Sequence, residues 1–141
     1  IGDHAHMALQ YSTTVRNAEL DALETAVGTS PILKIRSGSA PANCATADSG
    51  TVLATMTLPS DWLAAASSGS KAKSGTWQDS SADATGTAAH FRIYDSTGTT
   101  CHLQGTVTAT GGGGDLTLDN TSIASGQSIT INTFSITAAN A

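Results

Sequence analysis

The sequence predicts a mainly β fold, an antiparallel β-sandwich of the jelly-roll-like kind with one N-terminal α-helix. Helical spacing of apolar residues is confined to the part of the chain before Pro31. After Pro31, short runs alternate apolar and polar residues and are separated by turns rich in Gly, Ser and Asp. Such runs are typical of sheets that bury one face and expose the other. Threonine, which is β-branched and polar, suits the exposed face.

The length of 141 residues fits a single domain. Residues 1–6 carry two histidines and precede Met7, so we interpret them as the remnant of a tag. Residues 7–30 are then an N-terminal arm and helix, and residues 31–141 are the β-sandwich. No apolar leader follows Met7, so we expect a protein that is used without export and whose two cysteines stay free.

The helix has a start signal, one apolar stripe and a stop signal. Residues 12–14 are Ser-Thr-Thr, whose hydroxyls can cap the first turn. Leu20, Leu23 and Val27 then recur at helical spacing, and Gly28 stands where a helix ends in a left-handed residue. Because the stripe is narrow, it must pack against the rest of the domain or against another subunit.

The strand prediction rests on alternation, for about seven or eight short strands in all. The runs with the clearest alternation are residues 33–35, 52–58, 89–94, 101–103, 106–110, 116–118 and 129–136. In the last run, Ile129 and Ile131 are out of phase with Phe134 and Ile136, so we expect a β-bulge near residues 132–133.

A hairpin is predicted around Asp95–Gly98, where Asp favours the start of a type I turn and Gly the left-handed position after it. This register pairs Ile93 with Cys101 and Phe91 with Leu103. All four apolar side chains then point inward, and Cys101 is a small buried hydrophobe.

Charge and composition exclude several functions. Six Lys and Arg in a chain of net charge −5 give no basic surface for nucleic acid, and no apolar run approaches the roughly 18 residues of a membrane helix. The Gly111–Gly114 run lacks the lysine and helix start of a phosphate-binding loop, so we expect a flexible hairpin tip. The acids are interpreted as turn residues: Asp48, Asp61, Asp79, Asp83, Asp95, Asp115 and Asp119.

Histidine offers two weak metal hypotheses. In the predicted hairpin, His90 and His102 are diagonal neighbours on the outward face, but Arg92 would repel a cation there. We therefore favour two solvated histidines. A native metal-binding arm through His4 and His6 is the alternative to a tag. The sequence thus predicts no catalytic residues, no metal and no cofactor.

The interface candidates are Trp62, Trp77, Leu20, Leu23 and Val27. Both tryptophans are favoured as core residues because the chain has few other large side chains. The alternative is that at least one of them anchors a protein–protein contact, since Trp is enriched at interface centres.

Most of the chain from Tyr11 onward resembles a family of small virion proteins of tailed bacteriophages. The resemblance is carried by the sequence from Tyr11 to Gly28, by 33–43, by 78–86 and by the terminal stretches 123–127 and 134–137. It carries no catalytic motif, and it implies a phage protein. Fold, size and composition are similar to those of head decoration or cement proteins, which bind assembled capsids as small oligomers.

The sequence therefore predicts a non-enzymatic virion structural protein, assembled in the host cytoplasm. Its expected partners are the major capsid protein lattice or another virion protein, together with further copies of itself. The alternative is a tail or baseplate module that binds a host glycan or another tail protein. That alternative needs an exposed aromatic beside polar side chains, and residues 77–79 (Trp-Gln-Asp) are its candidate.

Overall fold

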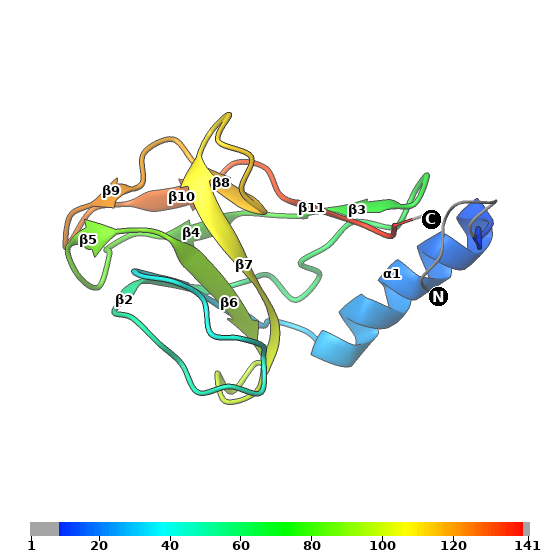
Figure 1. Cartoon of the computed structure of the whole chain (residues 1–141), viewed down its shortest axis with the longest axis horizontal. Coiled ribbons are helices and arrows are strands. Elements are labelled where there is room, and N and C mark those ends of the chain that lie inside the picture. Colours follow the sequence, from blue (N-terminus) through cyan, green and yellow to red (C-terminus); the bar gives the residue numbers. More distant parts are fainter. Residues whose placement is uncertain (1–8, 140–141) are drawn as a thin grey trace.

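A computed structural model describes residues 9–139 and shows a mainly β protein with one helix (Figure 1). The interpretation of residues 1–6 lies outside the described residues. The elements are α1 (Thr13–Val27), β1 (Ile32–Arg36), β2 (Val52–Thr57), β3 (Ser70–Ala72), β4 (Trp77–Asp79), β5 (Gly86–Thr87), β6 (His90–Tyr94), β7 (Cys101–Ala109), β8 (Leu116–Leu118), β9 (Ser122–Ile123), β10 (Ile129–Ile131) and β11 (Ser135–Thr137).

The start and the end of helix α1 are those predicted. The hydroxyl of Ser12 accepts a hydrogen bond from the backbone N–H of Val15 at 3.2 Å, which caps the first turn. Gly28 has a φ of 90°, and its N–H donates to the carbonyl of Glu24 at 3.0 Å. A residue with a side chain rarely adopts that φ, so Gly28 ends the helix.

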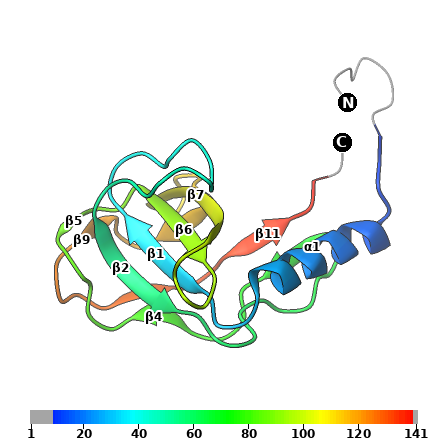
Figure 2. The ribbon, with the colours of Figure 1, turned by 90° about the horizontal axis from the view of Figure 1, so that it is seen from below.

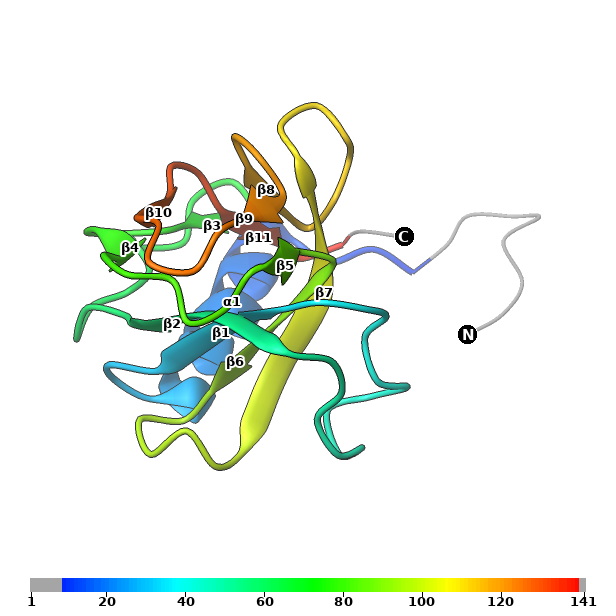
Figure 3. The same ribbon diagram turned by 90° about the vertical axis from the view of Figure 1, so that its left-hand side faces the viewer.

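The largest sheet has five strands in the order β2-β1-β6-β7-β8. Its pairs are antiparallel except for β7 with β8, which is parallel. Three two-stranded antiparallel sheets, β10-β4, β11-β3 and β5-β9, complete the described strands. Strands β8 and β10 lie across the molecule from β1 and β6 (Figure 3). Strand β4, which pairs with β10, lies beside β2, where the Asp79 carboxylate accepts from the backbone N–H of Thr55 at 2.9 Å.

An aromatic cluster lies at the centre of the core. The rings of Trp77 and Trp62 have centroids 6.0 Å apart, and those of Trp77 and Phe134 are 5.4 Å apart. Both indole N–H groups have backbone acceptors, the carbonyl of Gly28 for Trp62 and that of Ser74 for Trp77. Both tryptophans are fully buried, which confirms that they are core residues.

The register predicted for the hairpin is wrong. Ile93 pairs with Leu103 instead of Cys101, and Cys101 pairs with Tyr94. Phe91 likewise pairs with Gly105, two residues beyond the expected partner Leu103. A bulge between these pairs turns Cys101 to the face of the sheet that carries Tyr94, away from the core.

The turn itself explains the register. The N–H of Asp95 donates to the carbonyl of Thr100, which closes the loop beside Tyr94. The Asp95 carboxylate accepts from the N–H groups of Thr99 and Thr100, so one acid organises the whole loop. The turn residue was correctly predicted, but the bulge that follows it has no sequence signature.

The bulge predicted near residues 132–133 is also wrong. Ile129–Ile131 is strand β10 and pairs with β4, whereas Ser135–Thr137 is strand β11 and pairs with β3. The chain thus changes partner between the two runs. Phe134 still packs in the core, because it lies in the loop between β10 and β11, which turns its side chain inward without a bulge.

The Gly111–Gly114 run is not a hairpin tip, because β7 and β8 run parallel. Parallel strands normally need a long crossover, yet this chain doubles back within a few residues. A Cβ on Gly112 or Gly114 would lie 2.8 Å from the Thr108 side chain, so only glycine fits at either position. The N–H of Gly114 donates to the Thr108 hydroxyl at 2.9 Å.

Replacing Gly114 with alanine is expected to destabilise the fold by about 1–3 kcal/mol, because the new methyl group would also meet the Thr108 backbone nitrogen at 2.9 Å. Urea unfolding of the purified variant measures this loss. Combining Gly114→Ala with Thr108→Ala should recover part of it, since the hydroxyl and the methyl group of Thr108 are then absent. A Gly114→Ala variant as stable as the parent would contradict this role of the glycine.

Candidate functional site

Within residues 9–139, no three His, Cys, Asp or Glu side chains lie close enough to share a metal ion. Over the same residues, no helix combines the length and apolar character that crossing a bilayer requires. Two other regions concentrate unusual chemistry. One is a buried polar cluster on the outer face of the large sheet, and the other is an arm that projects from the β strands.

The outer face of the sheet is covered by residues 37–51, which connect β1 to β2 and which we call the crossing loop. The loop extends beside β6 and β7 (Figures 1 and 3). Its two ends are joined by a hydrogen bond from the N–H of Ser37 to the carbonyl of Thr51. The outward side chains of β6 are buried as a result, although an alternating strand would be expected to expose them.

His90 is one of the covered side chains, so its prediction as a solvated histidine is wrong. It is 1% exposed, and its Nδ1 lies 2.6 Å from the carbonyl oxygen of Gly38 in the crossing loop. Its Nε2 is buried without a hydrogen-bond partner. His102 is exposed, as predicted.

Arg92 fastens the crossing loop to the sheet. Its side chain is 2% exposed and donates to the Asp48 carboxylate at 2.6 Å and to the carbonyls of Asn43 and Thr46, both at 2.9 Å. Its Nε also donates to the side chain of Gln104 at 3.0 Å. The buried guanidinium of Arg92 thus finds acceptors for its N–H groups in the protein instead of in water. Because three of these acceptors belong to the crossing loop, they hold the loop in one position.

Asp48 is the counter-charge of the cluster. It lies 3.1 Å from Arg36 and 2.6 Å from Arg92, and the Tyr94 hydroxyl donates to it at 2.6 Å. Burial alone would raise the pKa of Asp48, but the hydrogen bonds from Tyr94 and Arg92 and the charge of Arg36 outweigh it and lower the pKa. One carboxylate therefore pairs with two buried cations. Sequence reasoning placed Asp48 in a turn and missed this role.

The two cysteines lie beside this cluster. Cys44 from the crossing loop and Cys101 from β7 line one surface pocket of about 340 Å³, together with Asp48, Arg92 and Tyr94. Both are free thiols. Burial and the neighbouring Cys44 raise the pKa of Cys101 to about 12. Cys101 is therefore not the inward core residue that the predicted hairpin implied.

The second region is an arm formed by α1 and the β3–β11 pair, which projects away from the large sheet (Figures 1 and 2). The buried Lys71 of β3 binds two acids of the helix, Asp21 at 2.7 Å and Glu24 at 2.9 Å. Arg16 donates to the carbonyl of Ala138 at 2.9 Å, next to β11. Polar contacts therefore supplement the narrow apolar stripe in holding the helix.

The exposed large apolar side chains of the described residues all lie at the start of this arm. Leu9 is 51% exposed, Tyr11 42% and Val15 46%. We call these three residues the arm patch. All three fall within residues 9–15, and exposed apolar residues that are not scattered singly are a feature of protein interaction sites.

The interface candidates of the sequence are mostly used inside the chain. Trp62, Trp77, Leu20 and Val27 are buried, and Leu23 is partly buried against the core. Their role between subunits stays a prediction. Because Trp77 is fully buried, its ring is not available as a platform on which a sugar could stack.

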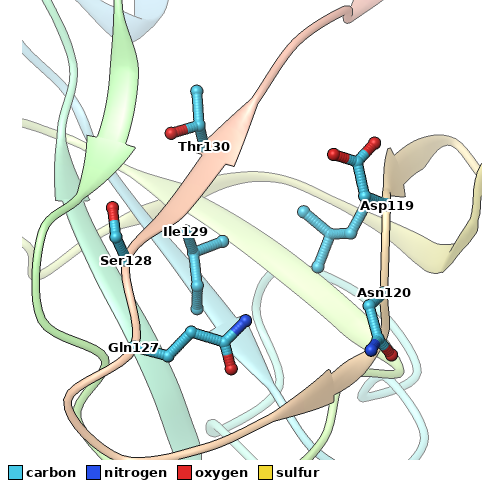
Figure 4. A pocket seen from close by; sticks show the side chains of 7 residues that line it. Asp119, Asn120, Gln127, Ser128, Ile129 and Thr130 are labelled. Atoms are coloured by element: carbon cyan, nitrogen blue, oxygen red, sulfur yellow. The ribbon is translucent and has the colours of Figure 1, made fainter.

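Two further pockets each contain a single carboxylate, and neither has the groups of a reactive site. The pocket of Figure 4 is polar and measures about 110 Å³; Asp119 and Gln127 are among its lining residues. That volume is small for an organic ligand, whose sites span about 300–1,000 Å³. A pocket of about 390 Å³ beside Phe134 contains one carboxylate, Asp115, which already accepts from the N–H and hydroxyl of Thr106.

No known protein family, curated protein or solved structure matches this chain. The resemblance to phage virion proteins gains no support from these comparisons and stays a prediction. The features of the chain that bear on its function are therefore its own: the arm patch and the charged side chains that make structural contacts.

Proposed function

We propose that this protein is a non-enzymatic structural protein of a bacteriophage virion, which binds the assembled capsid as a decoration or cement protein. The observation that supports it most is the arm patch, in which Leu9, Tyr11 and Val15 are each exposed within residues 9–15 at the start of a projecting arm. Burying such a patch against another protein is favourable at roughly 25 cal/mol per Å² of apolar surface.

The charged side chains support a binding role over an enzymatic one. Asp48 pairs with two arginines, Asp95 organises a turn, and Asp115, just before β8, accepts from Thr106 of β7. Catalytic sites instead bring together titratable groups whose pKa values are tuned for proton transfer. These three acids act as structural acceptors.

We interpret the five-stranded sheet and the strands that lie across from it as a β-sandwich of the jelly-roll-like kind. One hydrophobic cluster that draws on both sets of strands supports this, with Leu33 and Ile93 from one and Trp77 and Ile131 from the other. A rigid body of this type suits a protein whose task is to present a fixed surface.

Binding to a lattice stabilises it by mass action. A ligand that binds the assembled shell and not its free subunits shifts the equilibrium toward the shell. An affinity of roughly micromolar for each site, about −8 kcal/mol, is sufficient when it is repeated over many equivalent sites. We also propose a homo-oligomer, because another copy of the chain could bury the exposed apolar residues of the arm patch just as the capsid could.

Val15→Asp is expected to weaken binding to purified phage heads at least about tenfold, since it places a charge in the arm patch. The helix itself tolerates this change, because acids near a helix N-terminus are favourable. Co-sedimentation of the protein with heads measures the affinity, and light scattering measures the oligomeric state.

Thr14→Asp is the matched control, because it adds the same charge in the same helical turn at an exposed residue outside the patch. Its binding should stay close to that of the parent. Equal loss in both variants would point to charge alone and remove the arm patch from the proposal. Binding to isolated tails but not to heads would replace the capsid with the tail as the partner.

A further inference from the structure

The fold brings two thiols together that are 57 positions apart in the sequence. Cys44 comes from the crossing loop and Cys101 from the first residue of β7, and both line the same surface pocket. Neither is fully exposed or fully buried. The proximity depends on the bulge in β7, which turns Cys101 outward beside Tyr94.

The segment that carries Cys44 is held in place on both sides. The carbonyls of Asn43 and Thr46 both accept from Arg92 at 2.9 Å. The side chain of Asn43 also accepts from the N–H groups of Ala45 and Thr46. Cys44 is therefore presented to Cys101 by a fixed backbone, which lowers the entropy cost of joining the two thiols.

We propose that Cys44 and Cys101 form an intramolecular disulfide when the folded protein meets a low-molecular-weight disulfide oxidant. The bond would tie the crossing loop to β7 across the pocket that the two residues share. It does not depend on the proposed virion function, because it follows from the position of the two thiols alone.

The reaction balances as two thiol–disulfide exchanges. The Cys44 thiolate attacks one sulfur of the small disulfide, which forms a mixed disulfide and releases one small thiol. The Cys101 thiolate then attacks the Cys44 sulfur and releases the second small thiol. The protein loses two electrons and two protons, and the oxidant gains both as two thiols.

The order of these steps follows from the surroundings of the two sulfurs. With a pKa raised to about 12 by burial and by Cys44, Cys101 is almost wholly protonated near neutral pH and is a slow nucleophile toward a free oxidant. Once Cys44 carries the mixed disulfide, its sulfur is held beside Cys101, and proximity compensates for the small thiolate fraction.

The test uses the full chain, first reduced and then incubated with oxidised glutathione. We expect the intact mass to fall by about 2 Da, with no free thiol left and with a peptide that links Cys44 to Cys101. Closing a loop of this length should raise the melting temperature by about 10 °C, and dithiothreitol should reverse the rise.

Cys44→Ser and Cys101→Ser are the controls. Each should keep the fold by circular dichroism and show no rise in melting temperature with oxidised glutathione. In Cys101→Ser, the mixed disulfide on Cys44 should accumulate because nothing resolves it. A wild-type chain that keeps two thiols, collects two glutathione adducts or links only between molecules would overturn the proposal, as would a linked chain with an unchanged or lower melting temperature. None of these results bears on capsid binding.

Discussion

Trp77→Ala is expected to lower the free energy of unfolding by about 4 kcal/mol. The indole is fully buried between Trp62 and Phe134, with ring centroids 6.0 and 5.4 Å away. Truncation to alanine removes the contacts of the indole with both neighbouring rings and leaves a cavity. Because residue 77 is held in strand β4, the backbone cannot readily move in to fill that cavity. It also leaves the carbonyl of Ser74 without its indole donor. Since whole domains are stable by about 5–15 kcal/mol, this is a large part of the total.

Chemical denaturation followed by circular dichroism measures this loss. Trp77→Phe is the matched control, because it keeps an aromatic ring and should cost clearly less, about 1–2 kcal/mol. A Trp77→Ala chain as stable as the parent would contradict the part that Trp77 plays in the core.

Local signals predicted the helix and most of the strands. The cap at Ser12 and the stop at Gly28 depend on neighbouring residues alone, so sequence reasoning placed both ends of α1. The register of the hairpin failed because it depends on a bulge that no residue type marks. Strands β3, β4, β5 and β9 escaped prediction because their two or three residues do not alternate apolar with polar and back, as Leu116–Leu118 of β8 do.

The polar cluster was invisible for a different reason. Alternation in β6 correctly put Arg92 and Tyr94 on the face opposite the core, but the pattern cannot show that a distant loop covers that face. Asp48 has the sequence surroundings of an ordinary turn acid, and its two arginine partners are set by the tertiary fold. The signal available in the sequence was the pair of outward arginines in neighbouring strands, which require a counter-charge.

Asp48→Ala is expected to cost about 3 kcal/mol, because it leaves Arg36 and Arg92 in place without their carboxylate. The two side chains are 6% and 2% exposed, so water cannot hydrate them fully. Removing one partner of a buried pair costs about 3–5 kcal/mol. The lower end applies because the Asp48 side chain is 43% exposed and water already screens the pair. Asp119→Ala removes the same charge from an exposed position and should change stability by less than about 0.5 kcal/mol.

The pH dependence gives an independent test of the same cluster. The pKa of Asp48 is lower in the folded chain than its ordinary value, so protons bind the unfolded chain more readily. The stability that it contributes is therefore complete well above the unfolded pKa of about 3.9 and is lost as the pH falls through the folded value. The stability difference between the parent and Asp48→Asn should thus be constant from about pH 7 to about pH 5 and shrink below about pH 4. A difference that did not change down to about pH 2.5 would mean that the charge of Asp48 is not what holds the crossing loop.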